Sequence, residues 1–198
     1  VVVNDLRREY IDGPVFSSVV GYTGSQATQA AIVGKVGLER TYDDALRGTD
    51  GLHIFSRDAK GAVLDDHVVQ SALSGKTLVT TIDAGLQRFF YKRLEEGLRS
   101  LGVYSGVGIA MDPKSGEVLA LVNLPSYDNN IFVTPGKSQE RAKLVNDGVR
   151  KPLFNRAVSG AYNPGSTIKT LVALAALHEK IIKPTDVIYS AGYIDVPN

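Results

Sequence analysis

A run of seven apolar residues constrains the fold of this chain more than any other feature of its sequence. Residues 171–177 read Leu-Val-Ala-Leu-Ala-Ala-Leu, and leucine and alanine favour helices. The pattern predicts a helix from about residue 164 to residue 180. A helix that is apolar on nearly every face has to be covered by protein. We therefore predict that this helix is buried and that its first turn opens into the protein interior or a cleft.

The middle of the chain predicts a helix packed beside a β-hairpin. Apolar residues recur at helical spacing through residues 84–100, directly after Asp83, whose carboxylate suits an N-cap. Residues 106–111 and 117–123 have the composition of two strands around the turn sequence Asp-Pro-Lys-Ser-Gly, in which proline fixes φ and glycine accepts a positive φ. The β-branched residues 76–82 predict a further strand before the helix.

The first third of the chain differs from the rest because glycines interrupt its short apolar runs. The weaker elements that we expect along the chain are a helix over residues 38–46, strands over residues 53–56, 62–64, 67–70 and 189–196, and a helix around residues 138–145. The order of helices and hairpin indicates an antiparallel sheet with helices packed on it, an α+β fold. The change in character near Gly75 predicts two units, residues 1–75 and residues 76–198.

Charge and composition exclude several classes of function. The 198 residues include 22 Lys and Arg against 21 Asp and Glu, a net charge of +1, whereas a nucleic-acid-binding protein needs a surplus of basic residues. The absence of cysteine excludes disulfides, zinc–thiolate sites and cysteine nucleophiles. The three histidines are scattered, and Asp43 and Asp44 are interpreted as a solvated helix face. We therefore expect neither a metal nor a cofactor.

The strongest candidate for chemistry is the sequence Asn-Pro-Gly-Ser-Thr-Ile-Lys at residues 163–169. It places Ser166 in the first turn of the predicted apolar helix, and Lys169 follows three residues later on the same face. A serine hydroxyl needs a base to act as a nucleophile. A lysine can be that base only as the neutral amine, which burial and the positive end of a helix dipole both favour. A Ser–Lys acyl-transfer site is one interpretation.

The other interpretation of the same residues is purely structural. Ser-x-x-Lys occurs by chance in many proteins of this size, and Pro-Gly-Ser is a common way to begin a helix. The apolar helix that follows favours the catalytic interpretation, but these residues alone leave both open.

Several longer stretches resemble the penicillin-binding proteins, the D,D-transpeptidases that cross-link peptidoglycan. Residues 154–169 resemble the approach to the active-site serine of that family, and residues 107–122 resemble the first two strands of its transpeptidase sheet. Residues 80–83 and 125–128 are similar to adjoining segments of that domain, and residues 34–51 resemble the non-catalytic pedestal of class B members. The stretches occur in the family's order over nearly the whole chain.

The resemblance implies the organisation and the active site of the protein. Residues 1–75 would be the pedestal and residues 76–198 the first part of the transpeptidase domain, and residues 34–39 favour the elongation type. Ser166 would be the nucleophile, with Lys169 as its general base and the backbone N–H of Ser166 as one oxyanion donor. Tyr162 is a candidate for substrate binding.

The resemblance also implies ligands, partners and location. The ligands would be stem peptides ending in D-Ala-D-Ala and the β-lactam antibiotics that mimic them. The partners would be a membrane glycosyltransferase and other cell-wall synthesis proteins, bound through the pedestal. The protein would lie in the bacterial cell envelope, outside the cytoplasm, anchored to the inner membrane by an N-terminal segment that precedes this chain.

Two motifs of the family are not found in this sequence. No Ser-x-Asn occurs, and Lys114-Ser115-Gly116, which fits Lys-[Ser/Thr]-Gly by letter, precedes Ser166 and occupies the predicted hairpin turn. The family's Lys-Thr-Gly comes last in the chain. We therefore expect that this chain lacks part of the site and is inactive alone.

Two other functions stay open at this point. A serine β-lactamase or β-lactam sensor would share the Ser–Lys pair, although such proteins lack a pedestal. A non-catalytic scaffold of the cell-wall machinery would need only the pedestal. Glu39 and Arg40 are interpreted either as pedestal residues that support contacts between domains or as a surface ion pair.

Overall fold

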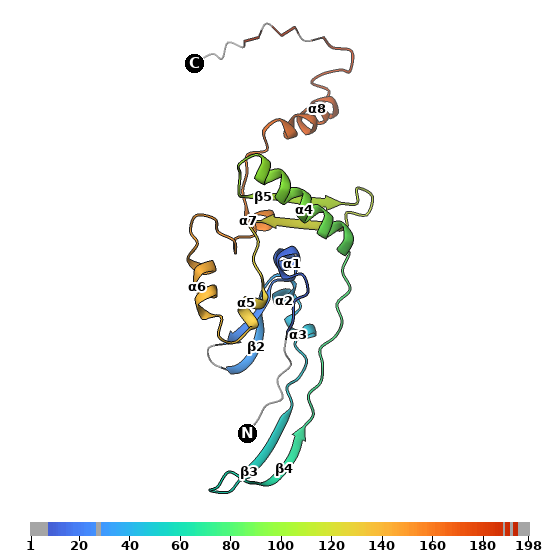
Figure 1. Ribbon diagram of the computed structural model, residues 1–198. Helices are drawn as coiled ribbons and strands as arrows, with labels where there is room; N and C mark the ends of the chain where they lie inside the picture. Colours follow the sequence, from blue (N-terminus) through green and yellow to red (C-terminus); the bar gives the residue numbers. More distant parts are fainter. Residues whose placement is uncertain (1–7, 27–28, 188, 191, 194–198) are drawn as a thin grey trace. The chain divides into compact units, whose positions relative to one another are not determined.

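The computed structural model describes residues 8–26, 29–187, 189–190 and 192–193. The chain groups into two compact units, Val1–Gly160 and Ala161–Asn198. The described residues of the first unit form three separate two-stranded antiparallel sheets, β1 with β2, β3 with β4 and β5 with β6 (Figure 1). Helices and small sheets together confirm the predicted α+β class.

The hairpin and the helix beside it form as the sequence predicts. Strands β5 (Gly106–Met111) and β6 (Val118–Leu124) pair with Ile109 opposite Leu121. Asp112 organises the turn, since its side chain accepts a hydrogen bond from the backbone N–H of Lys114 at 2.7 Å, and Gly116 has a φ of 78°. The Lys-Ser-Gly sequence is therefore a hairpin turn. Helix α4 (Ala84–Ser100) packs on β6 and begins at Asp83, whose side chain accepts from Leu86 N at 2.7 Å.

The apolar core of the first unit is small and centres on β6. Ala120, Val122 and Leu124 are buried together with Tyr10 and Tyr127. Helix α1 (Gly13–Val20) packs against β6 and α4, which places the N-terminal region over the hairpin. Residues on both sides of position 76 therefore contribute to one core while their strands stay in separate sheets. The predicted division at residues 75 and 76 stays a prediction.

One buried amide joins three elements of this core. Gln87 of α4 has no exposed surface. Its Nε2 donates to the carbonyl oxygens of Val15 and Leu121, each at 2.8 Å, and its Oε1 accepts from the backbone N–H of Leu121 at 2.8 Å. The side chain thus fixes α4 to the outer edge of β6 and to the first turn of α1.

The pedestal-like region is built around a buried carboxylate. Strands β1 (Tyr22–Gln26) and β2 (Gln29–Val36) form one hairpin, and the predicted helix over residues 38–46 is two short helices, α2 (Gly37–Thr41) and α3 (Asp43–Leu46). Glu39 is 5% exposed. It accepts a hydrogen bond from the Tyr10 hydroxyl at 3.2 Å and pairs with Arg8 at 3.1 Å. Glu39 is therefore part of a buried network and not of a surface ion pair.

Asp43 also has a structural role. Its Oδ1 accepts a hydrogen bond from the backbone N–H of Gly34 at 2.8 Å, and its other oxygen pairs with Arg47. The carboxylate thus joins α3 to β2, so the expected solvated helix face is wrong for Asp43.

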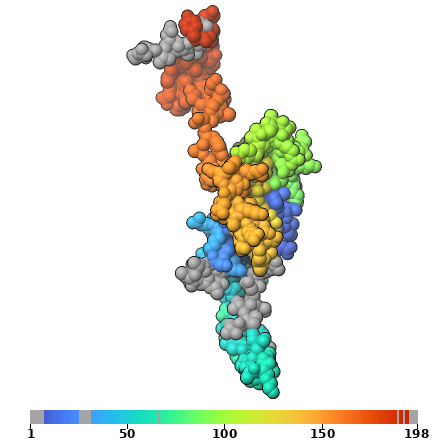
Figure 2. Space-filling view, turned by 60° about the vertical axis from the view of Figure 1, so that its left-hand side comes forward, coloured from blue at the N-terminus to red at the C-terminus, as the bar shows by residue number. Residues whose placement is uncertain are grey.

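The remaining elements include a second hairpin and several short helices. Strands β3 (Leu52–Arg57) and β4 (Val63–Gln70) pair antiparallel, so the strands predicted over residues 62–64 and 67–70 are one. Val63, Val68 and Val69 on β4 are more than half exposed, and the tip of this hairpin lies uncovered in Figure 2. The short helices are α5 (Asn130–Val133), α6 (Ser138–Asn146), which confirms the helix predicted there, and α7 (Arg156–Ser159).

The strand predicted over residues 76–82 is wrong. The chain runs from β4 to α4 without regular structure (Figure 1). Among the described residues, the hydrogen bonds that hold this segment lie near its ends: Lys76 N donates to Ala45 O at 2.7 Å, and Thr81 Oγ1 donates to Val118 O at 2.7 Å. On the edge of β6 that the segment approaches, Leu121 is already bonded to Gln87 and Leu119 O accepts from the backbone N–H of Asp83. These groups therefore offer residues 76–82 no free partner for a strand. The strand predicted over residues 189–196 lies mostly outside the described residues.

None of the helices formed by the described residues is long and apolar enough to cross a membrane.

We predict that Gln87→Leu loosens the packing of α4 on β6. The leucine fills similar space but leaves the N–H and the carbonyl of Leu121 without a partner, and each unpaired buried group costs about 1–3 kcal/mol. We expect a loss of about 3 kcal/mol in thermal unfolding and faster hydrogen exchange at the Leu121 amide. The exposed Lys92→Leu on the same helix is the control and should change stability by less than about 0.5 kcal/mol. Unchanged exchange at Leu121 in the Gln87 variant would contradict the role given to this amide.

We predict a loss of stability in alkali that depends on Tyr10. Burial is the main reason that the pKa of Tyr10 rises from 10.0 to about 12. The folded protein therefore holds the phenol proton more tightly than the unfolded chain. The resulting stabilisation is complete below pH 10 and is lost as the pH rises through 12, a change of about 2–3 kcal/mol.

Denaturant unfolding between pH 9 and 12 tests this expectation. Tyr10→Phe should be less stable at neutral pH, because the hydroxyl also accepts from Thr23 N at 2.9 Å, yet its stability should fall less steeply in alkali. Tyr193→Phe, at a residue that is 74% exposed, should follow the unmodified protein. Parallel pH curves for all three proteins would refute the prediction.

Candidate active site

The turn that carries Ser166 is a short 3-10 helix that continues into an α-helix. The 3-10 segment spans Gly165–Ile168, and α8 spans Lys169–His178. Gly165 has a φ of 57°, in the left-handed region that glycine adopts without strain. The hydroxyl of Thr167 donates to Pro164 O at 2.6 Å and fastens the turn. The predicted helix start is therefore confirmed in position.

The 3-10 geometry places the two candidate catalytic residues on one face. In a 3-10 helix, residues i and i+3 are eclipsed, and Lys169 follows Ser166 by that interval, with the backbone N–H of Lys169 donating to Ser166 O. Both side chains are exposed. Neither makes a hydrogen bond or an ion pair with the part of the chain that the structure describes. The nucleophile and base expected from the sequence are thus adjacent on one turn.

The predicted burial of the following helix is wrong for this chain. Leu171 is 62% exposed, Val172 58% and Leu174 59%. These side chains point from different faces of α8, as the sequence pattern requires. The described residues of the unit Ala161–Asn198 supply no surface that covers them. The apolar composition indicates that the helix needs a cover, but composition does not say which part of a protein provides it.

Tyr162, the candidate substrate-binding residue, precedes this turn. It is 66% exposed and makes no side-chain hydrogen bond or ring contact with the described residues. Its role therefore stays a prediction.

Two asparagines that the sequence pattern does not single out anchor residues 154–157 within the first unit. Asn123, buried at the end of β6, donates to Phe154 O at 3.2 Å and accepts from Arg156 N at 2.9 Å. Asn155 caps α7 by accepting from Ala157 N at 3.1 Å, and its Nδ2 donates to Ser18 O of α1 at 3.0 Å. The one sequence feature that points to this role is the presence of Asn123 in the otherwise apolar strand β6.

No group of histidine and acidic side chains suited to a metal ion occurs among the described residues.

Two family models match the chain in succession. The Penicillin-binding Protein dimerisation domain matches residues 2–80, and the Penicillin binding protein transpeptidase domain matches residues 106–197. Together they account for most of the sequence. The chain therefore belongs to the penicillin-binding proteins, with the dimerisation domain ahead of the transpeptidase domain as in class B. This confirms the resemblance found in the sequence.

Individual relatives agree with the family models. The peptidoglycan D,D-transpeptidase MrdA of Haemophilus influenzae is 36% identical, over 97% of this chain and 31% of its own length. MrdA of Acinetobacter baumannii is 34% identical, over 99% of this chain and 30% of its own length. The crystal structure of Pseudomonas aeruginosa PBP2 in complex with WCK 5153 is 33% identical, with a TM-score of 0.74, over 97% of this chain and 40% of that chain. The chain thus spans less than a third of the length of these MrdA proteins.

We predict opposite effects of the same substitution at two glycines. Gly165→Ala forces a left-handed φ on a residue with a Cβ and should destabilise the serine turn by about 1–2 kcal/mol. Gly97→Ala, in the last turn of α4, should stabilise by about 0.5–1 kcal/mol because alanine favours a helix more than glycine does. A Cβ at either position meets nothing within 4 Å, so crowding plays no part.

Hydrogen exchange in the full-length protein measures both effects. Amides at the start of α8 should exchange faster in Gly165→Ala, and those of α4 more slowly in Gly97→Ala. Equal exchange at the start of α8 in the Gly165 variant and the unmodified protein would contradict the assigned turn conformation.

Proposed function

We propose that the whole protein is a peptidoglycan D,D-transpeptidase of the elongation type, with Ser166 as its nucleophile. The observation that carries the proposal is the placement of Ser166 and Lys169 on one face of a helix start, within the residues matched by the transpeptidase model. The two MrdA relatives named above are peptidoglycan D,D-transpeptidases. The substrate is a stem peptide that ends in D-Ala-D-Ala.

The proposed reaction has two acyl-transfer steps. Lys169, as the neutral amine, takes the hydroxyl proton while Ser166 Oγ attacks the carbonyl carbon of the penultimate D-alanine. The C–N bond to the terminal D-alanine breaks, and that residue leaves as an amine with a proton returned by Lys169. An amine of a second stem peptide then attacks the ester and forms the cross-link, while Lys169 takes the amine proton and passes it to Ser166 Oγ, which leaves as the free hydroxyl.

The helix start contributes to this chemistry beyond the two side chains. The backbone N–H of Ser166 belongs to the first turn, where N–H groups have no helical acceptor, so it can donate to the oxyanion of the tetrahedral intermediate. The second donor would come from a part of the protein after this chain. Loss of one donor typically slows acyl transfer by about 10²–10³, so we expect this chain alone to react slowly or not at all.

The proposed transpeptidase activity also implies which ligands the protein binds and where it lies in the cell. The solved Pseudomonas protein is a complex with WCK 5153, and we propose that β-lactams acylate Ser166 here. The relatives are bacterial cell-wall proteins, which supports a place in the cell envelope; we propose that the protein lies outside the cytoplasm, anchored to the inner membrane. A membrane glycosyltransferase and other cell-wall synthesis proteins are proposed as partners of the pedestal.

We predict that benzylpenicillin forms a covalent adduct with the full-length protein at Ser166. Intact mass spectrometry should show a mass increase equal to one penicillin, and Ser166→Ala should abolish it. Lys169→Ala should slow adduct formation by at least about 10²-fold, the contribution typical of general base catalysis. Ser115→Ala, in the look-alike Lys-Ser-Gly turn, is the matched control and should react at the unmodified rate.

Each alternative gives a different result. An adduct that survives Ser166→Ala would mean that another residue is the nucleophile. An adduct that forms and is hydrolysed within seconds, with penicillin consumed in excess of protein, would indicate a β-lactamase. No adduct on any form of the full-length protein would support a non-catalytic scaffold.

A further inference from the structure

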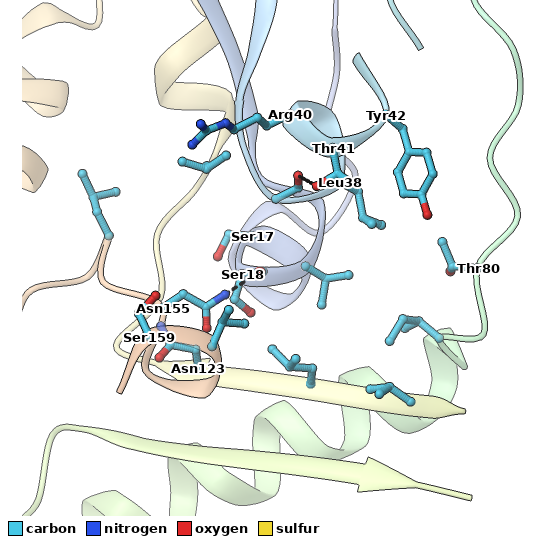
Figure 3. A pocket seen from close by; sticks show the side chains of 18 of the residues that line it. Ser17, Ser18, Leu38, Arg40, Thr41, Tyr42, Thr80, Asn123, Asn155 and Ser159 are labelled. Carbon is cyan, nitrogen blue, oxygen red and sulfur yellow. Dashed lines mark hydrogen bonds between the residues drawn. The ribbon is translucent and has the colours of Figure 1, made fainter. Parts of the chain in front are cut away.

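A large pocket lies in the first unit, and none of its lining residues belongs to the serine turn. Its volume is about 810 Å³, within the range of about 300–1,000 Å³ typical of ligand sites. Helices α1 and α2, strand β6, residues 78–82 and residues 152–159 line it. Figure 3 shows Ser17 and Ser18 of α1, Thr41 of α2 and Thr80 around the cavity. All of these residues belong to the unit Val1–Gly160.

One wall of the pocket is a backbone edge without partners. Within the described residues, none of the backbone N–H and carbonyl groups from Thr77 to Ile82 makes a hydrogen bond. Leu78 and Ile82 are half-buried, whereas Val79 is 87% exposed. The sequence of this segment favours a β-strand, and an unpaired strand edge is a template for pairing with another chain.

The pocket wall carries one charged side chain, and its charge is positive. Arg40 is the charged residue in the lining, which contains no Asp or Glu. Its side chain is exposed and makes no hydrogen bond or ion pair with the described residues. In Figure 3, Arg40 and Thr80 lie on opposite sides of the cavity. An occupant that pairs with residues 77–82 and extends across the pocket would therefore meet an unneutralised cation at its far side.

We propose that this pocket binds an extended, acidic peptide segment of a partner protein, which adds as a strand to residues 77–82. The peptide backbone would pair with the free groups of that edge, as in other complexes formed by strand addition. Alternate apolar side chains would enter the pocket, and a terminal carboxylate or an acidic side chain would pair with Arg40. This interaction is independent of the acyl-transfer chemistry proposed for Ser166.

Synthetic peptides test the proposal on the full-length protein. The probe is the fluorescein-labelled hexapeptide Val-Thr-Val-Thr-Val-Glu, measured by fluorescence polarisation. We expect saturable binding and protection of the amides of residues 77–82 from hydrogen exchange. The same peptide ending in lysine amide should bind at least about tenfold more weakly, and a version with N-methylated valines should not bind, because it lacks backbone donors.

A charge reversal separates the pocket from non-specific attraction. Arg40→Glu should lower the affinity for the glutamate peptide at least about tenfold and raise the affinity for the lysine peptide. Lys114→Glu, in the hairpin turn outside the pocket, is the control and should leave both affinities unchanged. Penicillin acylation should stay at the unmodified rate in both variants, so failure here would not bear on the proposed transpeptidase activity.

Three results would overturn the proposal. The first is no binding of the glutamate peptide at millimolar concentration. The second is protection of residues 77–82 before any peptide is added, which would mean that another part of the protein itself covers this edge. The third is an equal loss of affinity in Arg40→Glu and Lys114→Glu, which would indicate attraction by net charge alone.

Discussion

The three hydrogen bonds of Gln87 are the interaction on which the arrangement of the first unit depends. A two-stranded hairpin leaves both of its edges open, and such hairpins are marginally stable by themselves. Gln87 bonds the N–H and the carbonyl of Leu121 on one edge of β6 and the carbonyl of Val15 in α1. One side chain therefore closes a sheet edge and holds two helices against it. An apolar residue of the same size would pack there but would leave the N–H and the carbonyl of Leu121 unpaired.

Asparagine side chains likewise join segments that lie far apart in the chain, by hydrogen bonds to backbone groups. Asn123 holds residues 154–156 against β6, and Asn155 reaches α1. Asn129, buried without exposed surface, donates to Gly21 O at 2.7 Å. The apolar core consists of few residues, so directional hydrogen bonds carry much of the positioning. They bring the chain to α7, only a few residues before the turn that presents Ser166.

Two surfaces of the protein expose groups that the described residues leave uncovered or unpaired. Helix α8 exposes leucine and valine side chains directly after the proposed nucleophile. Burial there would favour the neutral form of a lysine, so a cover over α8 would also favour the form of Lys169 that the proposed reaction needs. Residues 77–82 expose backbone groups instead. The first surface fits the rest of a transpeptidase domain, and the second fits an added strand.

The sequence alone determined the features that depend on neighbouring residues. Asp83 caps α4, and the Asp-Pro-Lys-Ser-Gly turn makes the hairpin. Pro164 and Gly165 begin the helix that carries Ser166, and Lys169 follows Ser166 three residues later. Each requires contacts within about four residues, which residue order fixes. Only the tertiary structure decided that Glu39 is buried, that Gln87 and Asn123 hold distant segments, that residues 76–82 find no strand partner and that α8 is exposed. Those outcomes depend on groups far apart in the chain, and no local pattern specifies which of them meet.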